Sequence, residues 1–437
     1  MKLTKHELKL IQGFDQETTT LIISHWPNVG KSFDGVATYT QDLVIKFAKK
    51  FNHKFVVMVP YEWSGSMIKK VNKNILVVGV FDEQKLHLYP KILTWLKEFP
   101  RVKHVVVHSE FCASGGIYVR AMVIPFLALI KATGREVTYY AHNIASDIGE
   151  YQEHLGLPGG FRLVLTRLGY QYYLKSLAYV VDTFVVLEES IKERLVRVMG
   201  GKVRVLVVPH WIEAKNSKVS KIEARKILGI DKNLKVIVSF GFLSWYKGSD
   251  TVAEAAKCLP NSYLAVLAGG EATSLQNKLH YAQYLKILKR NVKASGKAAI
   301  TGFLSDKEMD LWFAAADLAI LPYRLSMGGS GALQQSLRRG VPTLISEAIR
   351  EGLSLDWPDS FDGNDPQDLS KAIKRYFDNV NLRKRVVMTV NNLAKQRSLG
   401  KLLSSHFEQV YVRPKNDKAM LEWNSEKYNQ EVKAVVG

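Results

Sequence analysis

The chain has 437 residues, of which 47% are hydrophobic and 23% are charged, and its formal net charge is +20. This length is too great for one ordinary core, so we expect two domains, and the composition excludes a low-complexity or disordered chain. Either this net charge comes only from basic residues on solvated helix faces, or it indicates an anionic partner. Such a partner would be nucleic acid, an anionic membrane surface or a phosphorylated small molecule. The basic residues form no single block, which argues against a nucleic-acid-binding arm.

Three features bear on location. Cys112 and Cys258 lie far apart in the sequence, which fits a reducing compartment and excludes a disulfide framework. Residues 1–17 are too polar for a secretory signal peptide. The longest apolar run, Ala121–Ile130, is too short to span a bilayer. We therefore expect a cytoplasmic protein that is at most peripheral on the cytoplasmic membrane face.

Short β-rich runs recur along the chain, and each is followed by a helical pattern, which is typical of βαβ units and parallel sheets. A polar stretch near residues 211–221 separates two series of such runs. We predict an α/β chain with two doubly wound domains, residues 1–212 and 213–396, followed by a helix and a polar tail over residues 397–437. The predicted strands are Thr20–Ser24, Phe55–Val59, Ile75–Val80, Val102–Val107, Val137–Tyr140, Thr183–Leu187, Val203–Val208, Val236–Phe240, Tyr263–Ala268, Ala298–Thr301, Leu318–Leu321 and Thr343–Ile345.

Candidate site residues follow strands, because doubly wound sheets bind ligands beyond the C-terminal ends of their strands. Gly35 ends the loop after the first predicted strand, where it either lets backbone approach a ligand or is a plain turn residue. His142 and Asn143 follow the strand that ends at Tyr140. A histidine there can hydrogen-bond a ligand or transfer a proton near neutral pH, or it can be bonded to backbone alone.

The segment Leu155–Val181 has no acidic residue but holds Arg162, Arg167, Lys175 and four tyrosines. Two interpretations remain open. The segment is either an interfacial helix that touches anionic lipid, or a partly buried helix whose basic side chains reach the solvent.

A second candidate loop, from Gly241 to Gly248, follows the predicted strand Val236–Phe240 and leads into a helix. Thr251 and Glu254 have the spacing of a capping box at the start of that helix. Lys247 adds a positive charge just before the helix start, where backbone N–H groups favour an anion. Lys247 is therefore either a phosphate-binding residue or a solvated lysine.

The most informative stretch is the strand, glycine loop, helix and strand between Ala315 and Ser346. Gly328, Gly329 and Gly331 surround Ser330, and a helix is predicted directly after them. A loop of small residues that opens a helix at the end of a strand points several N–H groups in one direction. The sequence therefore predicts an anion site, and phosphate is the usual anion.

Five fragments of the second half, in their order and spacing, resemble the GT-B glycosyltransferases, specifically the retaining family 4, also called glycosyl transferases group 1. In the first half, Asp34-Gly35-Val36 resembles the glycine loop of this family, and Ala141-His142-Asn143 resembles its strand-end histidine. The five fragments are GFLSWYKGSDTVAEAAKCLP, LAVLAGG, ITGFLSDKEMDLWFAAADLAILPYR, SGALQQSLRRGVPTLIS and DPQDLSKAI.

The resemblance implies a GT-B fold of two Rossmann-like domains that face each other across a cleft. The nucleotide-sugar donor is expected on the second domain and the acceptor on the first, and the helix Leu402–Val410 is expected to cross back to the first domain. His142 and Lys247 are implied as the catalytic residues, with His142 beside the transferred sugar and Asn143 on the acceptor side. The residues implied in donor binding are Gly35, Gly241, Lys247, Ser330, Gly331, Ala332 and Gln335.

Three positions depart from the family pattern. Phe242 stands where the family often has an arginine, so Lys247 has less help with the donor diphosphate. Met327 and Gln335 stand where the family has two glutamates eight positions apart. Gln335 can still bond a ribose hydroxyl, whereas Met327 cannot replace an acid near the sugar. A subgroup with a serine-glycine pair in this loop has similar losses, so we interpret these changes as a subgroup signature.

We therefore predict an enzyme that moves a sugar from a nucleotide-sugar to a glycan, a lipid-linked or a small-molecule acceptor, with retention of anomeric configuration. The resemblance implies that no metal is needed, and the chain has no DxD motif. No cofactor is expected, since the nucleotide-sugar is a substrate. The partners expected are the donor, the acceptor and an anionic membrane surface, without nucleic acid. The alternatives are a GT-B sugar-nucleotide epimerase, a catalytically weak sugar-nucleotide-binding protein and a basic nucleic-acid binder, although the chain lacks the motifs of known nucleic-acid-binding modules.

Overall fold

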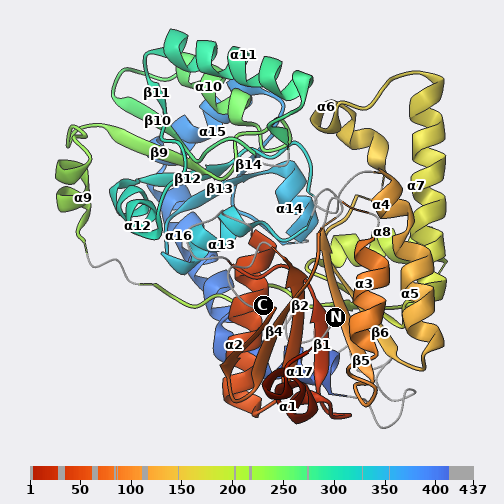
Figure 1. The fold of residues 1–437 in the computed structure, drawn as a ribbon. Helices are drawn as coiled ribbons and strands as arrows, with labels where there is room; N and C mark the ends of the chain where they lie inside the picture. Colours follow the sequence, from red (N-terminus) through yellow and green to blue (C-terminus); the bar gives the residue numbers. More distant parts are fainter. Residues whose placement is uncertain are drawn as a thin grey trace.

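The computed structural model has two α/β domains, each with helices around a sheet (Figure 1), which confirms the predicted fold class. It describes residues 3–27, 35–61, 67–82, 85, 87–110, 117–145, 147–200, 203–215, 219–272, 275–326, 328–353 and 355–412.

The described strands of the first domain form an eight-stranded sheet in the order β3-β4-β2-β1-β5-β6-β7-β8. All neighbours are parallel except β3 and β4. The sequence did not predict β3, because four of its five side chains are exposed and it has no apolar run. The strands are β1 Thr20–Ile23, β2 Phe55–Pro60, β3 Ile68–Asn72, β4 Ile75–Phe81, β5 His104–Glu110, β6 Glu136–Asn143, β7 Thr183–Val186 and β8 Arg204–Val207.

The second domain has a six-stranded sheet in the order β11-β10-β9-β12-β13-β14, and all described neighbours are parallel. Both of its faces are covered, so its strands are almost continuously apolar. The strands are β9 Lys235–Phe240, β10 Tyr263–Ala268, β11 Ala298–Ile300, β12 Leu318–Leu321, β13 Thr343–Ser346 and β14 Ser360–Phe361.

The helices of each domain cover the two faces of its sheet (Figure 1). In the first domain they are α1 Lys5–Phe14, α2 Gly35–Phe51, α3 Leu88–Leu96, α4 Ile117–Ala121, α5 Val123–Ala132, η1 Ile148–Tyr151, α6 Gln152–Leu155, α7 Phe161–Val180 and α8 Glu189–Met199. In the second they are α9 Lys221–Ile227, α10 Ser249–Lys257, α11 Leu279–Ser295, α12 Asp306–Ala315, α13 Gly331–Arg338, α14 Glu347–Leu353, α15 Pro366–Asp378 and α16 Val380–Gln396.

The strand order locates the binding crevice of each sheet. In the first sheet the order reverses between β1 and β5, and in the second it reverses between β9 and β12. Ligands of doubly wound sheets bind at these reversal points, beyond the carboxyl ends of the strands. In the second domain, the loops after β9 and β12 are the two that the sequence singles out.

The chain passes between the domains twice, and the two crossings are hydrogen-bonded to each other. The N–H of Ile212 donates to the carbonyl of Arg397 (2.6 Å), and the N–H of Leu399 donates to the carbonyl of Ile212 (3.1 Å). The last helix, α17 (Leu399–Tyr411), packs in a core cluster of the first domain, with residues of β1, β2 and α2. The domain limits 1–212, 213–396 and 397–437 stay a prediction, and residues 413–437 lie outside the described part.

Two local predictions were wrong in detail. Helix α10 begins at Ser249 with Gly248 as its N-cap, so Thr251 and Glu254 form no capping box. The hydroxyl of Thr251 donates to the carbonyl of Gly363 instead (2.9 Å), and Glu254 pairs with Lys257 (2.8 Å). Strand β6 continues through His142 to Asn143, because its pairing with β5 extends beyond Tyr140.

Within the described ranges, no helix is both long and apolar enough to cross a membrane.

Candidate functional site

The loop after β9 holds Lys247 against the backbone of Gly241. A Cβ atom at Gly241 would stand 2.7 Å from the Lys247 Nζ atom, and the backbone of Gly241 has a φ of +128°, which L side chains rarely adopt. The positive φ favours glycine at this position, and a side chain there would also displace the lysine ammonium. The lysine side chain thus lies back across the start of its own loop, and the structure brings the predicted residues Gly241 and Lys247 together.

Three aromatic rings surround the Lys247 ammonium. Its Nζ atom lies 5.7 Å from the ring centroid of Phe242, 5.7 Å from that of Tyr246 and 5.6 Å from that of Tyr323. Burial alone would lower the pKa of Lys247, but the phenols of Tyr246 and Tyr323 raise it above its usual value. Lys247 is therefore a fixed positive charge at neutral pH. Phe242, which occupies the expected arginine position, adds no second charge and packs against the ammonium instead.

The N-terminus of α13 lies next to this lysine through Tyr323. Ser330 is the N-cap of α13: its Oγ accepts from the Leu333 N–H (3.2 Å) and donates to the Tyr323 hydroxyl (3.1 Å). Gly331, the first helical residue, is exposed, and a Cβ atom there would meet nothing within 4 Å. Ala332 is buried behind it. A helix N-terminus with open space in front and a lysine nearby is suited to bind an anion.

Arg324 clamps the two loops together. Its guanidinium donates two hydrogen bonds to Asp250 (2.9 and 2.7 Å) and one to the carbonyl of Trp245 (2.5 Å). Its own N–H donates to the carbonyl of Tyr246 (2.8 Å). A bidentate pair of this kind fixes geometry as well as charge, so Arg324 positions the loop that carries Lys247.

The glycine loop of the second domain touches the first domain directly. A Cβ atom at Gly328, where φ is +142°, would stand 2.4 Å from the carbonyl oxygen of His142. A Cβ atom at Gly329 would stand 2.6 Å from the ring of His210. Only a residue without a side chain allows these approaches. The structure therefore brings the backbone of His142 into contact with the glycine loop.

His142 belongs to a cluster of buried rings. Its Nε2 atom lies 3.4 Å from Nδ1 of His108, and its ring centroid lies 4.9 Å from that of Tyr140 and 5.0 Å from that of Tyr39. Burial, together with the charge on His142 when it is protonated, lowers the pKa of His108 well below its usual value. Burial and the same neighbour lower the pKa of His210. These two histidines are thus neutral at physiological pH.

A short segment of the first domain, η1 and α6, reaches the second domain beside Lys247. The Tyr151 hydroxyl donates to the carbonyl of Ser326 (3.2 Å), and the His280 Nε2 donates to the carbonyl of His154 (3.2 Å). The ring of His154 lies 4.7 Å from that of Tyr246. Burial, His280 and the Lys247 ammonium lower the pKa of His154 to about 4.

Glu188 is a buried carboxyl at the contact between the domains. It follows β7, and its Oε2 accepts a hydrogen bond from the hydroxyl of Ser326 (3.1 Å), which precedes the glycine loop. Burial raises the pKa of Glu188, although the nearby Arg397 opposes this. The carboxyl therefore favours its protonated form more than a solvated glutamate does.

Three predicted positions, and Met327, are not joined to this arrangement. The amide oxygen of Gln335 accepts a hydrogen bond from Arg339, which also pairs with Asp310. Gly35 is the exposed first residue of α2, and a Cβ atom there would meet nothing within 4 Å. Asn143 ends β6, and its side chain, like Met327, lies outside the described part of the chain. Their roles stay predictions.

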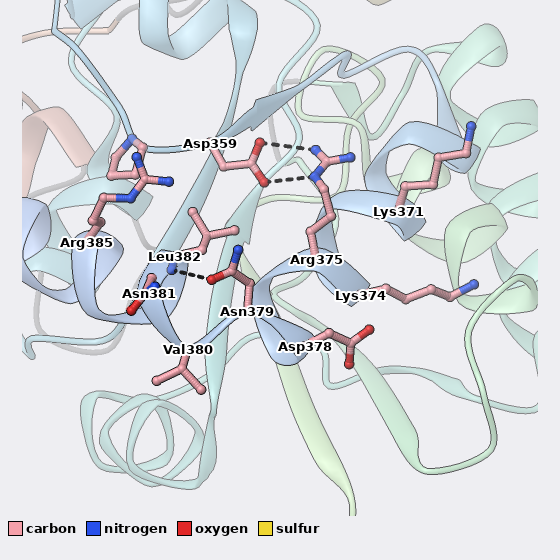
Figure 2. A pocket seen from close by; sticks show the side chains of 11 residues that line it. Asp359, Lys371, Lys374, Arg375, Asp378, Asn379, Val380, Asn381, Leu382 and Arg385 are labelled. Carbon is pink, nitrogen blue, oxygen red and sulfur yellow. Dashed lines mark hydrogen bonds and ion pairs between the residues drawn. The ribbon is translucent and has the colours of Figure 1, made fainter.

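An open groove of about 890 Å³ lies elsewhere on the second domain, between α15 and α16 (Figure 2). Asp359 holds the Arg375 guanidinium with two hydrogen bonds (3.1 and 3.2 Å). None of the residues that line this groove belongs to the loops after β9 and β12. We therefore do not assign the anion site to it.

The described part of the chain contains no group of three or more His, Cys, Asp or Glu side chains placed to hold a metal ion. The expectation that the reaction needs no metal stays a prediction.

Sequence reasoning missed several residues of the region where the two domains meet. Tyr323 and Arg324 lie two and three residues after the end of β12, so their position after a strand was a usable signal. Glu188 likewise follows β7. His154 lies in the short helix α6 and His210 in an irregular segment. Neither carries a local signal, because only the tertiary fold brings them to the region where the domains meet.

Comparison with known proteins identifies the second domain. Residues 220–391 match the family described as glycosyl transferases group 1. Mannosylfructose-phosphate synthase from Agrobacterium fabrum is 29% identical over 144 residues, which are 30% of this chain and 31% of that protein. This match thus spans less than a third of the length of the curated relative.

Solved structures share the fold over nearly the whole chain. Sucrose-phosphate synthase from Thermosynechococcus elongatus is similar with a TM-score of 0.69 and 13% identity, over 90% of this chain and 98% of the other. HepE from Anabaena, in complex with UDP-glucose, is similar with a TM-score of 0.64 and 15% identity, over 90% and 100% of the two chains. The resemblance inferred from the sequence is confirmed: the second domain is a group 1 glycosyl transferase domain, and the chain has the GT-B fold.

Proposed function

We propose that this protein is a glycosyltransferase that uses a nucleotide-sugar as donor and retains the anomeric configuration of the transferred sugar. One observation carries the proposal: the Lys247 ammonium and the open N-terminus of α13, joined through Tyr323, lie at the reversal point of the second sheet. HepE, whose fold is similar, was solved in complex with UDP-glucose, which supports a nucleotide-sugar as donor.

The chemistry needs a stabilised leaving group. When the bond between the sugar and the nucleoside diphosphate breaks, negative charge develops on the diphosphate. Lys247 and the first N–H groups of α13 would meet this charge, and since they are fixed before the reaction, they need no rearrangement. Arg324 would act as a positioning residue by holding the Lys247 loop. His142 would lie beside the transferred sugar and Gly35 beside the diphosphate from the first domain, with Ala332 and Gln335 on the donor side.

The acceptor is proposed to bind on the first domain, near His142 and Asn143. The names of two similar proteins, sucrose-phosphate synthase and mannosylfructose-phosphate synthase, support a sugar phosphate as one acceptor class. A glycan or a lipid-linked acceptor stays in the proposal. The cytoplasmic location stays a prediction.

The proposal is tested first by donor binding. The protein is heated with each member of a panel of nucleotide-sugars, and a true donor raises the unfolding midpoint, because it binds only the native state. In the Lys247→Ala variant the donor should no longer raise the midpoint. Lys257 is an exposed lysine of α10, so in the Lys257→Ala variant the donor should raise the midpoint as in the wild type. A panel in which no nucleotide-sugar raises the wild-type midpoint contradicts the proposal.

Product analysis then separates the alternatives. A glycosyltransferase releases nucleotide only together with a glycosylated acceptor. An epimerase converts the nucleotide-sugar without any acceptor, and a non-catalytic protein binds the donor without turnover. Measuring turnover after treatment with a chelator tests the absence of a metal requirement: we expect the full rate to remain, and loss of turnover that added metal restores would show that a metal is needed.

A further inference from the structure

Helix α7 lies along the outer edge of the first domain (Figure 1) and is apolar on two opposite sides. Its inner side contributes Tyr170, Leu174 and Leu177 to the core of that domain. The outer side of a surface helix is normally polar. The outer side of α7 is apolar instead, and its apolar residues are not buried within this chain.

The exposed apolar residues form one stripe. Phe161, Val164, Leu165, Leu168 and Tyr172 are between 50% and 75% exposed. At 3.6 residues per turn their positions fall within an arc of about 100°, opposite the buried side. We call these five residues the α7 outer face. Contiguous exposed apolar patches mark interaction sites.

Positive charge flanks the α7 outer face. Arg162 and Lys175 are exposed on the same helix, and neither forms an ion pair within the described residues. Arg167 is held by Asp147, with its Nε atom 2.9 Å from Oδ1. Helix α7 has no acidic residue. An apolar stripe with basic flanks is complementary to acyl chains beneath anionic headgroups, since the stripe matches the chains and the basic residues match the headgroups.

We infer that the α7 outer face docks this protein on an anionic lipid bilayer, with α7 lying in the plane of the surface. The helix has 20 residues, which gives a contact about 30 Å long. The inference concerns a surface away from the donor loops and does not depend on the proposed function.

Flotation with lipid vesicles tests the inference. Vesicles of phosphatidylcholine with phosphatidylglycerol should carry the protein upward at low salt, and vesicles of phosphatidylcholine alone should carry much less. Each basic residue near an anionic surface strengthens binding about fivefold, so the double variant Arg162→Gln, Lys175→Gln should bind about 25-fold more weakly. Absence of binding to the anionic vesicles at low salt, or equal binding to both kinds of vesicle, overturns the inference.

A second pair of variants isolates the apolar stripe. Leu168→Glu with Tyr172→Glu should abolish flotation, because it puts acids where the acyl chains would lie. The matched control is Ile222→Glu with Met388→Glu, since both residues are exposed apolar side chains of the second domain, and it should float like the wild type. All side chains changed are exposed, so the unfolding midpoints should stay equal to that of the wild type.

The other occupant of such a face would be a second copy of this chain. Light scattering after gel filtration distinguishes the two cases. A monomer that floats with anionic vesicles supports the inference. A dimer that Leu168→Glu with Tyr172→Glu dissociates, together with no vesicle binding, overturns it in favour of self-association.

Discussion

The two domains meet at the candidate site, and their facing surfaces, the two walls, are built differently. The second domain provides two glycine-containing loops around one permanent charge, Lys247, and a helix N-terminus. The first domain provides a cluster of aromatic and histidine rings that includes His142, and burial lowers the pKa of two of its members, His108 and His210. A surface with a permanent positive charge thus faces a surface whose histidines have lowered pKa values. We expect mutation to act mainly through the first and pH mainly through the second.

The ring cluster of the first wall is assembled from many elements. Tyr39 comes from α2, His108 from β5 and Tyr140 from β6, and His406 comes from α17 after the chain has crossed back. His406 is almost completely buried, and neither of its ring nitrogens has a hydrogen-bond partner in the described structure. The crossing of the chain thus adds a titratable group to the first domain that no neighbouring sequence reveals.

The largest effect on turnover should follow removal of the Lys247 charge from the second domain. We expect Lys247→Ala to lower turnover about 10²- to 10³-fold, the scale of removing one preorganised donor at a developing negative charge. The measurement is the rate of nucleotide release at saturating donor and acceptor. Lys257→Ala is the control and should keep the wild-type rate. Wild-type turnover in Lys247→Ala would end the assignment of this lysine.

The next largest effect, on the free energy of unfolding, should come from Gly328, where the two domains touch. We expect Gly328→Ala to destabilise the protein by about 2 kcal/mol or more, because a side chain there adopts a disfavoured backbone conformation and meets the His142 carbonyl at 2.4 Å. Gly331→Ala has open space and should leave the stability of the free protein unchanged, while its methyl group weakens donor binding. Urea unfolding without and with donor measures both. Equal stabilities for the two variants would contradict the close contact.

A smaller effect concerns the pH dependence of stability, and it comes from histidines of the first domain. Burial lowers the pKa of His406 to about 3 and, with His280 and Lys247, that of His154 to about 4. Below pH 6.5 the unfolded chain therefore binds more protons than the native protein, so stability is full above that pH and falls as the pH decreases toward the native values. Between pH 7.5 and 5.5 the loss should be about 1 kcal/mol for each of these histidines.

The variant His406→Phe separates this effect from general acid sensitivity. It keeps a ring among the neighbours of His406, which include Phe47 and Tyr411, and removes a titratable group without partners. Urea unfolding at both pH values should show a shallower pH dependence than in the wild type. An unchanged dependence would mean that His406 is not a source of the acid sensitivity.

The smallest effect should come from Glu188, which joins the walls through Ser326. Because burial raises its pKa, the fold favours the protonated carboxyl, and this contribution is lost as the pH rises through the native pKa. We expect Glu188→Gln to raise the stability at pH 7 by less than about 1 kcal/mol, measured by thermal unfolding. A lower stability at pH 7 would mean that the attraction to Arg397 outweighs the cost of burial.

The sequence located the loops of the second domain better than the ring cluster of the first, for a physical reason. Gly241, Lys247, Ser330 and Gly331 lie in two loops that directly follow strands, so local spacing alone brings each set together. The strands themselves were recognisable because buried parallel strands are continuous apolar runs. Exposed β3 lacks such a run and was missed.

The rest of the site depends on contacts between distant segments. His154 reaches Tyr246 only through the bridge formed by η1 and α6, and His210 reaches Gly329 only because the two crossings of the chain are paired. The amide oxygen of Gln335 accepts a hydrogen bond from Arg339, four residues later in the sequence, and its bond to a ribose hydroxyl stays a prediction. Periodicity cannot reveal which of its neighbours a polar side chain will bond.

The most direct test is a crystal structure with the nucleotide-sugar that raises the unfolding midpoint most. The diphosphate should lie within hydrogen-bonding distance of the Lys247 Nζ atom and of the first N–H groups of α13, with the sugar directed toward His142. A diphosphate bound away from the loops after β9 and β12, for example in the groove between α15 and α16, would contradict the donor site.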